Sequence, residues 1–175
     1  MASVVVPYDP AWPGMFEAER ERLQEALGAW LEGGIHHVGS TAVRELAAKP
    51  IIDMLAGVRD LDEARAALPA LEALGYEYKP HRPEAHLFHR PCYHLHLTEP
   101  GSDLWRERLT FRDALRRDPE LRREYTEWKL EHAATGIEAY AASKWPFVAR
   151  VLAEDGIELR ADLRLLSPEE LARRS

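Results

Sequence analysis

The stretch from Ile35 to Val58, IHHVGSTAVRELAAKPIIDMLAGV, decides the fold of this chain. It holds two apolar runs rich in Ile and Val, each bounded by Gly or Pro, and both runs are therefore predicted to be strands. Ser40 or Thr41 can cap a segment of one or two helical turns, which Pro50 ends. The stretch thus predicts a strand, a Gly-Ser turn, a short helix and a second strand.

The turn and the second strand both carry groups suited to chemistry. The Gly39–Ser40 turn offers backbone N–H groups at a helix start, where an anion such as phosphate binds well. Asp53 opens the second strand, and a carboxylate is the usual oxygen ligand for Mg²⁺. A carboxylate in an apolar strand needs a metal, a cation or an N–H partner. The alternative is a structural Asp53 that bonds to the turn.

A Gly-Ser turn followed by an acidic strand resembles the signature of the nucleotidyltransferase superfamily. The longer string, His37-Val-Gly-Ser-Thr and then Leu46-Ala-Ala-Lys-Pro-Ile-Ile-Asp53, is similar to the GrpB-like family of that superfamily. The resemblance covers about Val4 to Ala153. It implies an α+β, nucleotidyltransferase-like fold, with a small mixed β-sheet flanked by helices and an added C-terminal helical part.

Length and composition set the broad class. The 175 residues are enough for one domain with its own core, and no apolar run approaches the roughly 20 residues that a membrane span needs. The N-terminus lacks a signal-peptide pattern, and the single cysteine, Cys92, excludes an internal disulfide. A cytoplasmic protein without a membrane partner is therefore expected. The net charge of −7 argues against extensive nucleic-acid binding, although local cations can still hold a small anion.

The rest of the chain divides into a sheet-containing part, 1–100, and a helical part, 101–156. A helix is expected from Asp9-Pro10 to about Leu31, with Glu19 interrupting its apolar positions, and another over 61–74 with a break at Pro69. Strands are expected at 76–79, 85–89 and 93–97 as an antiparallel meander. Helices are expected at 103–117, 118–134 and 137–154. The charged tail, 157–175, contains apolar residues and could dock on the domain or on a second copy as a homodimer.

His94 and His96 alternate on one predicted strand and therefore point to the same face of the sheet. The resemblance suggests that this strand occupies the place of the superfamily's third carboxylate. Together with Asp53 and His37, these histidines could form a metal site, which suits Zn²⁺, Mn²⁺ or Fe²⁺ better than Mg²⁺. The alternative is histidines hydrogen-bonded on a polar face. Asp53, His94 and His96 are the predicted catalytic residues.

Leu55 departs from the superfamily pattern. Active nucleotidyltransferases carry a second acid two residues after the first, because two carboxylates hold the catalytic metal. Leu55 stands at this position and cannot ligate a hard cation. The carboxylate set is therefore incomplete, and the sequence leaves open whether the protein is an enzyme.

The predicted phosphate-binding residues combine the turn with cations elsewhere in the chain. Lys49 could reach a phosphate at the turn or pair with Asp53. Cations of the helical half could form an anion-binding lid or could be snorkelling side chains beside an apolar stripe. His81, His86 and His89 are expected at the surface. The predicted phosphate-binding set is Gly39, Ser40, Thr41, Lys49, Arg112 and Lys144.

Three functions follow from these patterns. The leading hypothesis is a nucleotidyltransferase-like enzyme that acts on a nucleotide or another phosphate-bearing small molecule. It would transfer a nucleotidyl or phosphoryl group with a divalent metal, Mg²⁺ or Mn²⁺, with Zn²⁺ also open. The second is a catalytically inactive module that binds a nucleotide or metabolite. The third is a metal-binding protein or metal-dependent hydrolase that uses the histidines and Asp53.

Overall fold

The computed structural model describes residues 5–132 and 137–158, apart from the side chains of residues 80–81 and 137–142. The predicted tail from residue 159 onward lies outside this description. The elements in chain order are α1 (Trp12–Leu27), β1 (Leu31–Val38), η1 (Ser40–Ala42), β2 (Ile52–Val58), η2 (Glu63–Ala67), α2 (Leu68–Ala73), β3 (Glu77–Arg82), β4 (Ala85–Arg90), β5 (Tyr93–Thr98), α3 (Asp103–Arg117), α4 (Pro119–His132) and α5 (Ile137–Glu154).

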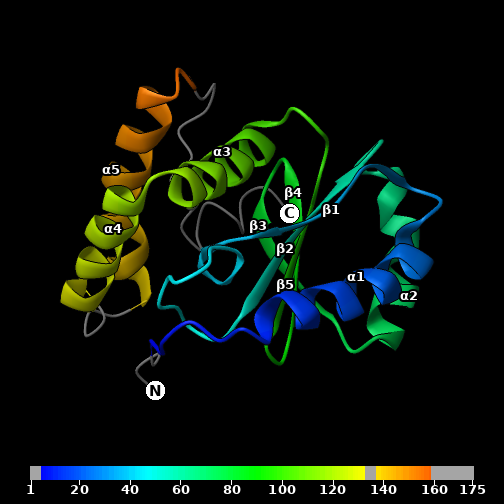
Figure 1. The fold of residues 1–175 in the computed structure, drawn as a ribbon. Coiled ribbons are helices and arrows are strands. Elements are labelled where there is room, and N and C mark those ends of the chain that lie inside the picture. The colour runs from blue at the N-terminus through cyan, green and yellow to red at the C-terminus, as the bar shows by residue number, and fades with distance from the viewer. Residues whose placement is uncertain (1–4, 133–136, 159–175) are drawn as a thin grey trace.

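A five-stranded mixed sheet forms the centre of the fold, with strand order β1-β2-β5-β4-β3 (Figure 1). Strands β3, β4 and β5 pair antiparallel, as the predicted meander requires, and β1 pairs antiparallel with β2. Strand β2 pairs in parallel with β5, so that Asp53 lies opposite His94. The predicted α+β fold with a small mixed sheet is confirmed.

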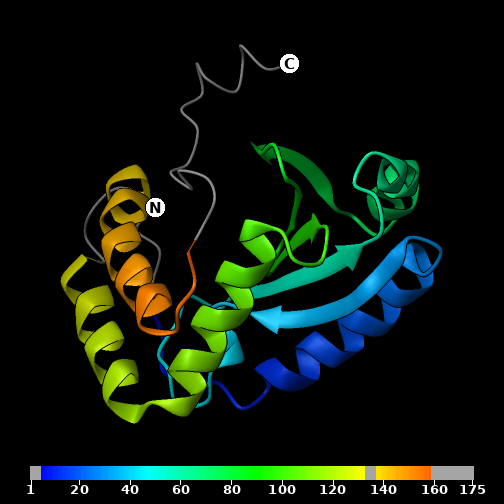
Figure 2. The same ribbon diagram turned by 90° about the horizontal axis from the view of Figure 1, so that it is seen from above.

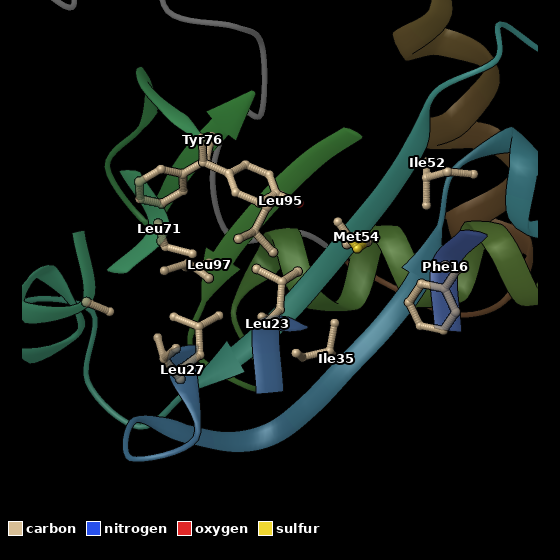
Figure 3. Packing of buried hydrophobic residues seen from close by; sticks show 14 of the residues in the cluster. Phe16, Leu23, Leu27, Ile35, Ile52, Met54, Leu71, Tyr76, Leu95 and Leu97 are labelled. Carbon is tan, nitrogen blue, oxygen red and sulfur yellow. The ribbon is translucent and has the colours of Figure 1, made fainter. Parts of the chain in front are cut away.

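Helices cover both faces of the sheet (Figure 2). On one face, α1 and α2 pack against β2 and β5 and bury a hydrophobic core (Figure 3). Its members include Leu23 of α1, Leu71 of α2, Met54 of β2 and Leu95 of β5. Helix α3 lies on the other face and packs with α4 and α5 in a second core around Tyr125. The molecule therefore has a sheet part and a helical part that meet along α3.

Two predicted elements differ from the structure. The segment after the Gly-Ser turn forms only a three-residue 3₁₀ helix, because the chain soon becomes extended and Ala48 exchanges two backbone hydrogen bonds with Val6. That bridge also ties the N-terminal segment at Val6 to the chain before β2. The helix expected over 61–74 is split into η2 and α2. Pro69 lies in the first turn of α2, where a backbone N–H would have no acceptor within the helix, so its absence costs no hydrogen bond.

Glu19 lies on the buried face of α1 and is only 2% exposed, so it does not face solvent as an interruption of the helix would. Its carboxylate accepts a hydrogen bond from the Tyr76 hydroxyl at 2.8 Å and forms ion pairs with Arg90 at 3.3 Å and Arg22 at 3.2 Å. Burial and the hydrogen bond to Glu19 raise the pKa of Tyr76. This network joins α1 to the far end of the sheet.

The sheet and α3 approach each other most closely at two glycines. A Cβ on Gly57 would lie 2.8 Å from the Cα of Gly33 and 2.9 Å from Cζ3 of Trp105. Trp105 lies in the first turns of α3, so both glycines let the indole ring pack directly on the backbone of β1 and β2.

Replacing Gly57 with Ala is expected to lower the free energy of unfolding by about 1–3 kcal/mol, because the added methyl group meets backbone and a large ring. The matched control is Gly14→Ala in α1, where an added Cβ meets nothing within 4 Å. That change is expected to be neutral or stabilising. Urea denaturation of both variants measures the difference. Equal stability of the two variants would contradict the close packing of Trp105.

Candidate functional site

The Gly39–Ser40 turn follows β1 and lies directly against Asp53. Gly39 has φ 71° and ψ −173°, a conformation that favours glycine. Val38 pairs with Asp53 across the β1–β2 ladder, and a Cβ on Gly39 would lie 2.5 Å from Oδ2 of Asp53. The absence of a side chain at Gly39 therefore lets the carboxylate approach the turn.

A pocket of about 310 Å³, part of it open to solvent, lies between this turn and the three C-terminal helices. The turn contributes Gly39 and Ser40 to its wall. Two of its lining residues, Arg108 and Lys144, carry a positive charge. The lining residues are Gly39, Ser40, Glu107, Arg108, Phe111, Tyr125, Lys144 and Val148.

Glu107 is the acidic residue in that wall, and it is buried with an arginine. Its carboxylate accepts a hydrogen bond from Arg82 at 3.1 Å and lies 3.9 Å from Arg108. Burial alone would raise the pKa of Glu107, but the guanidinium groups of Arg108 and Arg82 lower it, together with Lys144. Glu107 is therefore ionised and pairs with both Arg82 and Arg108. Because Lys144 also acts on this one carboxylate, the cations around it outnumber it and leave an excess of positive charge.

Lys129 of α4 lies behind the turn and is 3% exposed. Its ammonium donates a hydrogen bond to the carbonyl of Ala47, lies 3.4 Å from Oγ of Ser40 and sits 4.7 Å from the centre of the Tyr125 ring. Burial, followed by repulsion from Lys144, lowers the pKa of Lys129 to about 7. Ser40 also hydrogen bonds with Tyr125, so the turn is held from α4 by two side chains.

Asp53 and His94 form a pair on neighbouring strands. Nδ1 of His94 lies 3.2 Å from Oδ1 of Asp53, and both side chains are about one-third exposed. His89, the cross-strand partner of His94 on β4, stacks on its ring with 3.8 Å between the ring centres. Burial and then the neighbouring His94 lower the pKa of His89. His89 is therefore not the surface residue that the sequence suggested.

His37 lies on the opposite face of the sheet from Asp53, so it does not join Asp53 in the metal site that the sequence suggested. It pairs with Met54, whose side chain belongs to the α1 core, and its ring stacks on Phe16 of α1 at 4.8 Å. Val38, and not His37, is the cross-strand partner of Asp53. The neighbouring His36, which pairs with Leu55, is the histidine of β1 on the Asp53 face.

The hydrogen bonds of His37 fix its tautomer. Thr41 donates its one hydroxyl proton to the carbonyl of Ile51 at 2.9 Å, so Nε2 of His37, 3.0 Å away, must carry a proton and donate it to Thr41. Burial lowers the pKa of His37 to about 4, although the charge of Asp53 acts in the other direction. His37 is therefore a neutral structural donor near pH 7.

The buried neutral state of His37 predicts a loss of stability in acid. The unfolded chain takes up a proton below pH 6.5 and the folded one only below about 4, so stability falls by about 3 kcal/mol across this window as pH falls. Urea denaturation of the wild type and His37→Gln at pH 7.5, 5.5 and 4 measures this loss of stability. A difference between the two proteins that stays constant with pH would contradict it.

His96 and Leu55 are buried side by side in the next row of the sheet. His96 is 5% exposed and pairs across the strands with Leu55, which is fully buried. Among the described residues, no three His, Cys, Asp or Glu side chains come together in a metal-binding group. The predicted set of His37, Asp53, His94 and His96 is therefore divided between two faces and two rows, with Asp53 and His94 remaining as the close pair.

The predicted phosphate-binding residues separate into two groups. Gly39, Ser40 and Lys144 line the pocket. The Thr41 hydroxyl is engaged between His37 and Ile51, and Arg112 donates a hydrogen bond to the carbonyl of His37 at 3.1 Å. Lys49 is half-buried before β2 and is not among the described residues that line the pocket.

Glu107, Arg108 and Lys129 were not predicted as site residues. Each lies in a helix of the C-terminal half, and only the packing of α3 and α4 on the turn brings them to Ser40. The four-residue spacing of Tyr125 and Lys129 puts them on one helix face, which was the available signal. This spacing is equally typical of a lysine whose stem packs on an apolar surface while its charge reaches solvent, so the sequence did not single out Lys129.

This fold and turn define a class of protein: an α+β domain of the nucleotidyltransferase type, with a Gly-Ser turn beside an acidic strand. The chain belongs to the GrpB protein family, which matches residues 3–154. The resemblance drawn from the sequence is therefore confirmed. Among residues 5–132 and 137–158, none of the helices is long and apolar enough to cross a membrane.

Several proteins of known sequence or structure are similar to this chain. UPF0157 protein PA4798 of Pseudomonas aeruginosa is 40% identical over 162 residues, covering 85% of this chain and 65% of that protein. UPF0157 protein SCO7215 of Streptomyces coelicolor is 39% identical over 120 residues, or 67% of this chain and 63% of that protein. The chain thus spans less than two-thirds of either relative. The crystal structure of conserved protein GrpB from Enterococcus faecalis has a TM-score of 0.77 and 28% identity, covering 86% of this chain and 96% of that one.

Proposed function

We propose that this protein binds a phosphate-bearing small molecule, such as a nucleotide, with its phosphate in the pocket at the Gly39–Ser40 turn. One observation carries the proposal: Arg108 and Lys144 line the same pocket as the turn, and the acidic residue in its wall, Glu107, is shared between Arg82 and Arg108. An acidic chain of net charge −7 thus concentrates positive charge at one concave site. Such a focused charge favours a small anion over a long nucleic acid.

The lining of the pocket supports a phosphate as the group that enters it. Phe111 and Val148 give it an apolar wall, while Ser40 offers a hydroxyl. The phosphate part of a nucleotide fits this combination, and the rest of the molecule would extend toward the open side.

Metal-assisted transfer is the second candidate, and the Asp53–His94 pair favours it. The pair lies beside Gly39, and one carboxylate with one imidazole suits Mn²⁺ or Zn²⁺ better than Mg²⁺. Two protein ligands are fewer than such ions need, so a metal would bind together with phosphate oxygens. Leu55 is fully buried where the superfamily carries a second acid, which favours binding over two-metal transfer. The cytoplasmic location and the homodimer stay predictions from the sequence.

The test is a thermal-shift screen of pyrophosphate, ADP and ATP, each with and without Mg²⁺ or Mn²⁺. A ligand at 100 times its Kd adds about 2.7 kcal/mol, which raises Tm by roughly 5–10 °C in a domain of this size. Lys144→Met is expected to remove most of the shift. The matched control is Lys79→Met, because Lys79 lies on the outer strand β3, paired with Glu77 at 2.8 Å.

The outcomes separate the two candidates. A shift without metal that disappears in Lys144→Met supports phosphate binding alone. A shift that needs Mn²⁺ and disappears in Asp53→Asn supports the metal-assisted reaction and justifies a search for turnover. If none of the phosphates shifts the wild type, or if Lys144→Met responds like Lys79→Met, the proposed site is wrong.

A further inference from the structure

Lys129 combines deep burial with hydrogen-bond partners that carry no charge. Its ammonium contacts the Ala47 carbonyl, the Ser40 hydroxyl and the face of the Tyr125 ring, which are all neutral groups. Lysines are almost never buried to this extent unless a carboxylate or another anion pairs with them. The site therefore holds a cation whose counter-charge is not supplied by these three partners.

The charges around Lys129 make its position more costly for a protonated amine. Lys144 of α5 repels it, and Lys144 lines the pocket in front of the turn together with Arg108 of α3. Glu107 also faces this pocket, but Arg82 and Arg108 both pair with its carboxylate. A folded protein gains nothing in stability from gathering cations in this way, whereas an anion that enters the pocket would relieve their repulsion.

We propose that Lys129 is a positioning residue of the phosphate site: from behind the Gly39–Ser40 turn, and through the Ser40 hydroxyl, it supplies positive charge to an anion in the pocket. This inference rests on the proposed function. No covalent step is involved. The amine takes up one proton from solvent as the anion binds, and it releases that proton when the anion leaves.

Proton uptake by Lys129 predicts the direction in which anion affinity changes with pH. Because the pKa of Lys129 in the free protein is about 7, its charged fraction falls as pH rises above this value, and anion affinity falls with it. The other ionisable groups nearby do not titrate in the same way: burial lowers the pKa of His37 to about 4, and burial raises the pKa of Tyr125. A fall in affinity between pH 7 and 9 would therefore report Lys129.

Sulfate is the probe for this experiment, because it remains a dianion from pH 6 to 9. NMR titration of the lysine side chains follows its binding, and the sequence contains only Lys49, Lys79, Lys129 and Lys144. In the wild type, sulfate affinity is expected to fall between pH 7 and 9 as Lys129 loses its proton, by about tenfold in total, which is the loss expected for Lys129→Met. The Lys129 signal is expected to move toward the charged form when sulfate binds.

Three variants complete the experiment. Lys129→Met is expected to weaken sulfate binding by about tenfold at pH 6.5 and to remove the pH dependence. Lys129→Arg keeps the charge at every pH, so its affinity is expected to stay constant from pH 7 to 9. Lys144→Met removes a repulsive neighbour and is expected to raise the pKa of Lys129 that NMR measures in the protein without sulfate. Urea denaturation confirms that each variant is folded.

The outcomes are distinct from those of the proposed function. If sulfate binds the wild type with unchanged affinity from pH 7 to 9, and Lys129→Met binds as well as the wild type, the role of Lys129 is wrong while the phosphate site stands. If Lys129→Arg shows the same pH dependence as the wild type, another group titrates and the role of Lys129 is again wrong. If neither sulfate nor pyrophosphate binds the wild type at any pH, the phosphate site itself is wrong, and the inference falls with it.

Discussion

Replacing Glu19 with Ala is expected to lower the free energy of unfolding by about 3–5 kcal/mol, since it breaks a buried ion pair by removing one partner. The change leaves Arg90 without its carboxylate and the buried Tyr76 hydroxyl without its acceptor. Glu19→Gln retains an acceptor for Tyr76 and is expected to cost less. Chemical denaturation at pH 7 measures both differences.

The matched control is Glu17→Ala, two positions earlier on the same helix. Glu17 is 54% exposed and pairs with Arg20 on the surface of α1. Surface ion pairs contribute about 0–1 kcal/mol, so this change is expected to be nearly neutral. If Glu19→Ala were as mild as Glu17→Ala, the buried network between α1 and the sheet would not have the importance assigned to it.

Replacing Gly39 with Ala is expected to lower stability by about 3 kcal/mol or more and to weaken phosphate binding by at least tenfold. The positive φ of Gly39 costs a non-glycine residue roughly 1–3 kcal/mol. The new methyl group would also lie 2.5 Å from Oδ2 of Asp53, and overpacking of this kind costs about 1–3 kcal/mol more. Asp53 or the turn must move, which changes the wall of the pocket.

Gly75→Ala is the control that separates the backbone strain of a positive φ from the steric contact with Asp53. Gly75 also has a positive φ, 87°, but an added Cβ there meets nothing within 4 Å. Its replacement is expected to cost stability through φ alone and to leave phosphate binding unchanged. Pyrophosphate titrations of both variants by calorimetry measure the contrast. Equal affinity in Gly39→Ala and the wild type would show that the approach of Asp53 to the turn has no part in binding.

The sequence predicted most of the fold because its signals are local. Alternating strand residues and Pro-containing turns placed the three strands of the meander, and Gly or Asp-Pro boundaries placed α3, α4 and α5 within about two residues. The segment after the turn was the main error. Its capping residues favour a helix, but the bridge from Ala48 to Val6 extends the chain, and that contact lies over 40 residues away in sequence.

The site was predicted only in part, because it depends on which face each side chain takes and on how the helical half packs. The sequence singled out the turn, Asp53 and His94, and the structure brings them close together at one edge of the sheet. His37 was assigned to the same metal site as Asp53, but it pairs with Met54 and faces α1, because the register between β1 and β2 could not be read from the sequence. The position of Lys129 beside Ser40 results from the packing of α4 on the turn, and no local sequence pattern predicts that packing.

The most direct test of the phosphate site is the change in backbone amide chemical shifts when pyrophosphate is added to the wild-type protein. The account predicts saturable shifts that are largest at Gly39 and Ser40, with further shifts near Arg108 and Lys144. It also predicts that these shifts are lost in Gly39→Ala. Saturable shifts confined to another surface, or no saturable shifts at all, would contradict it.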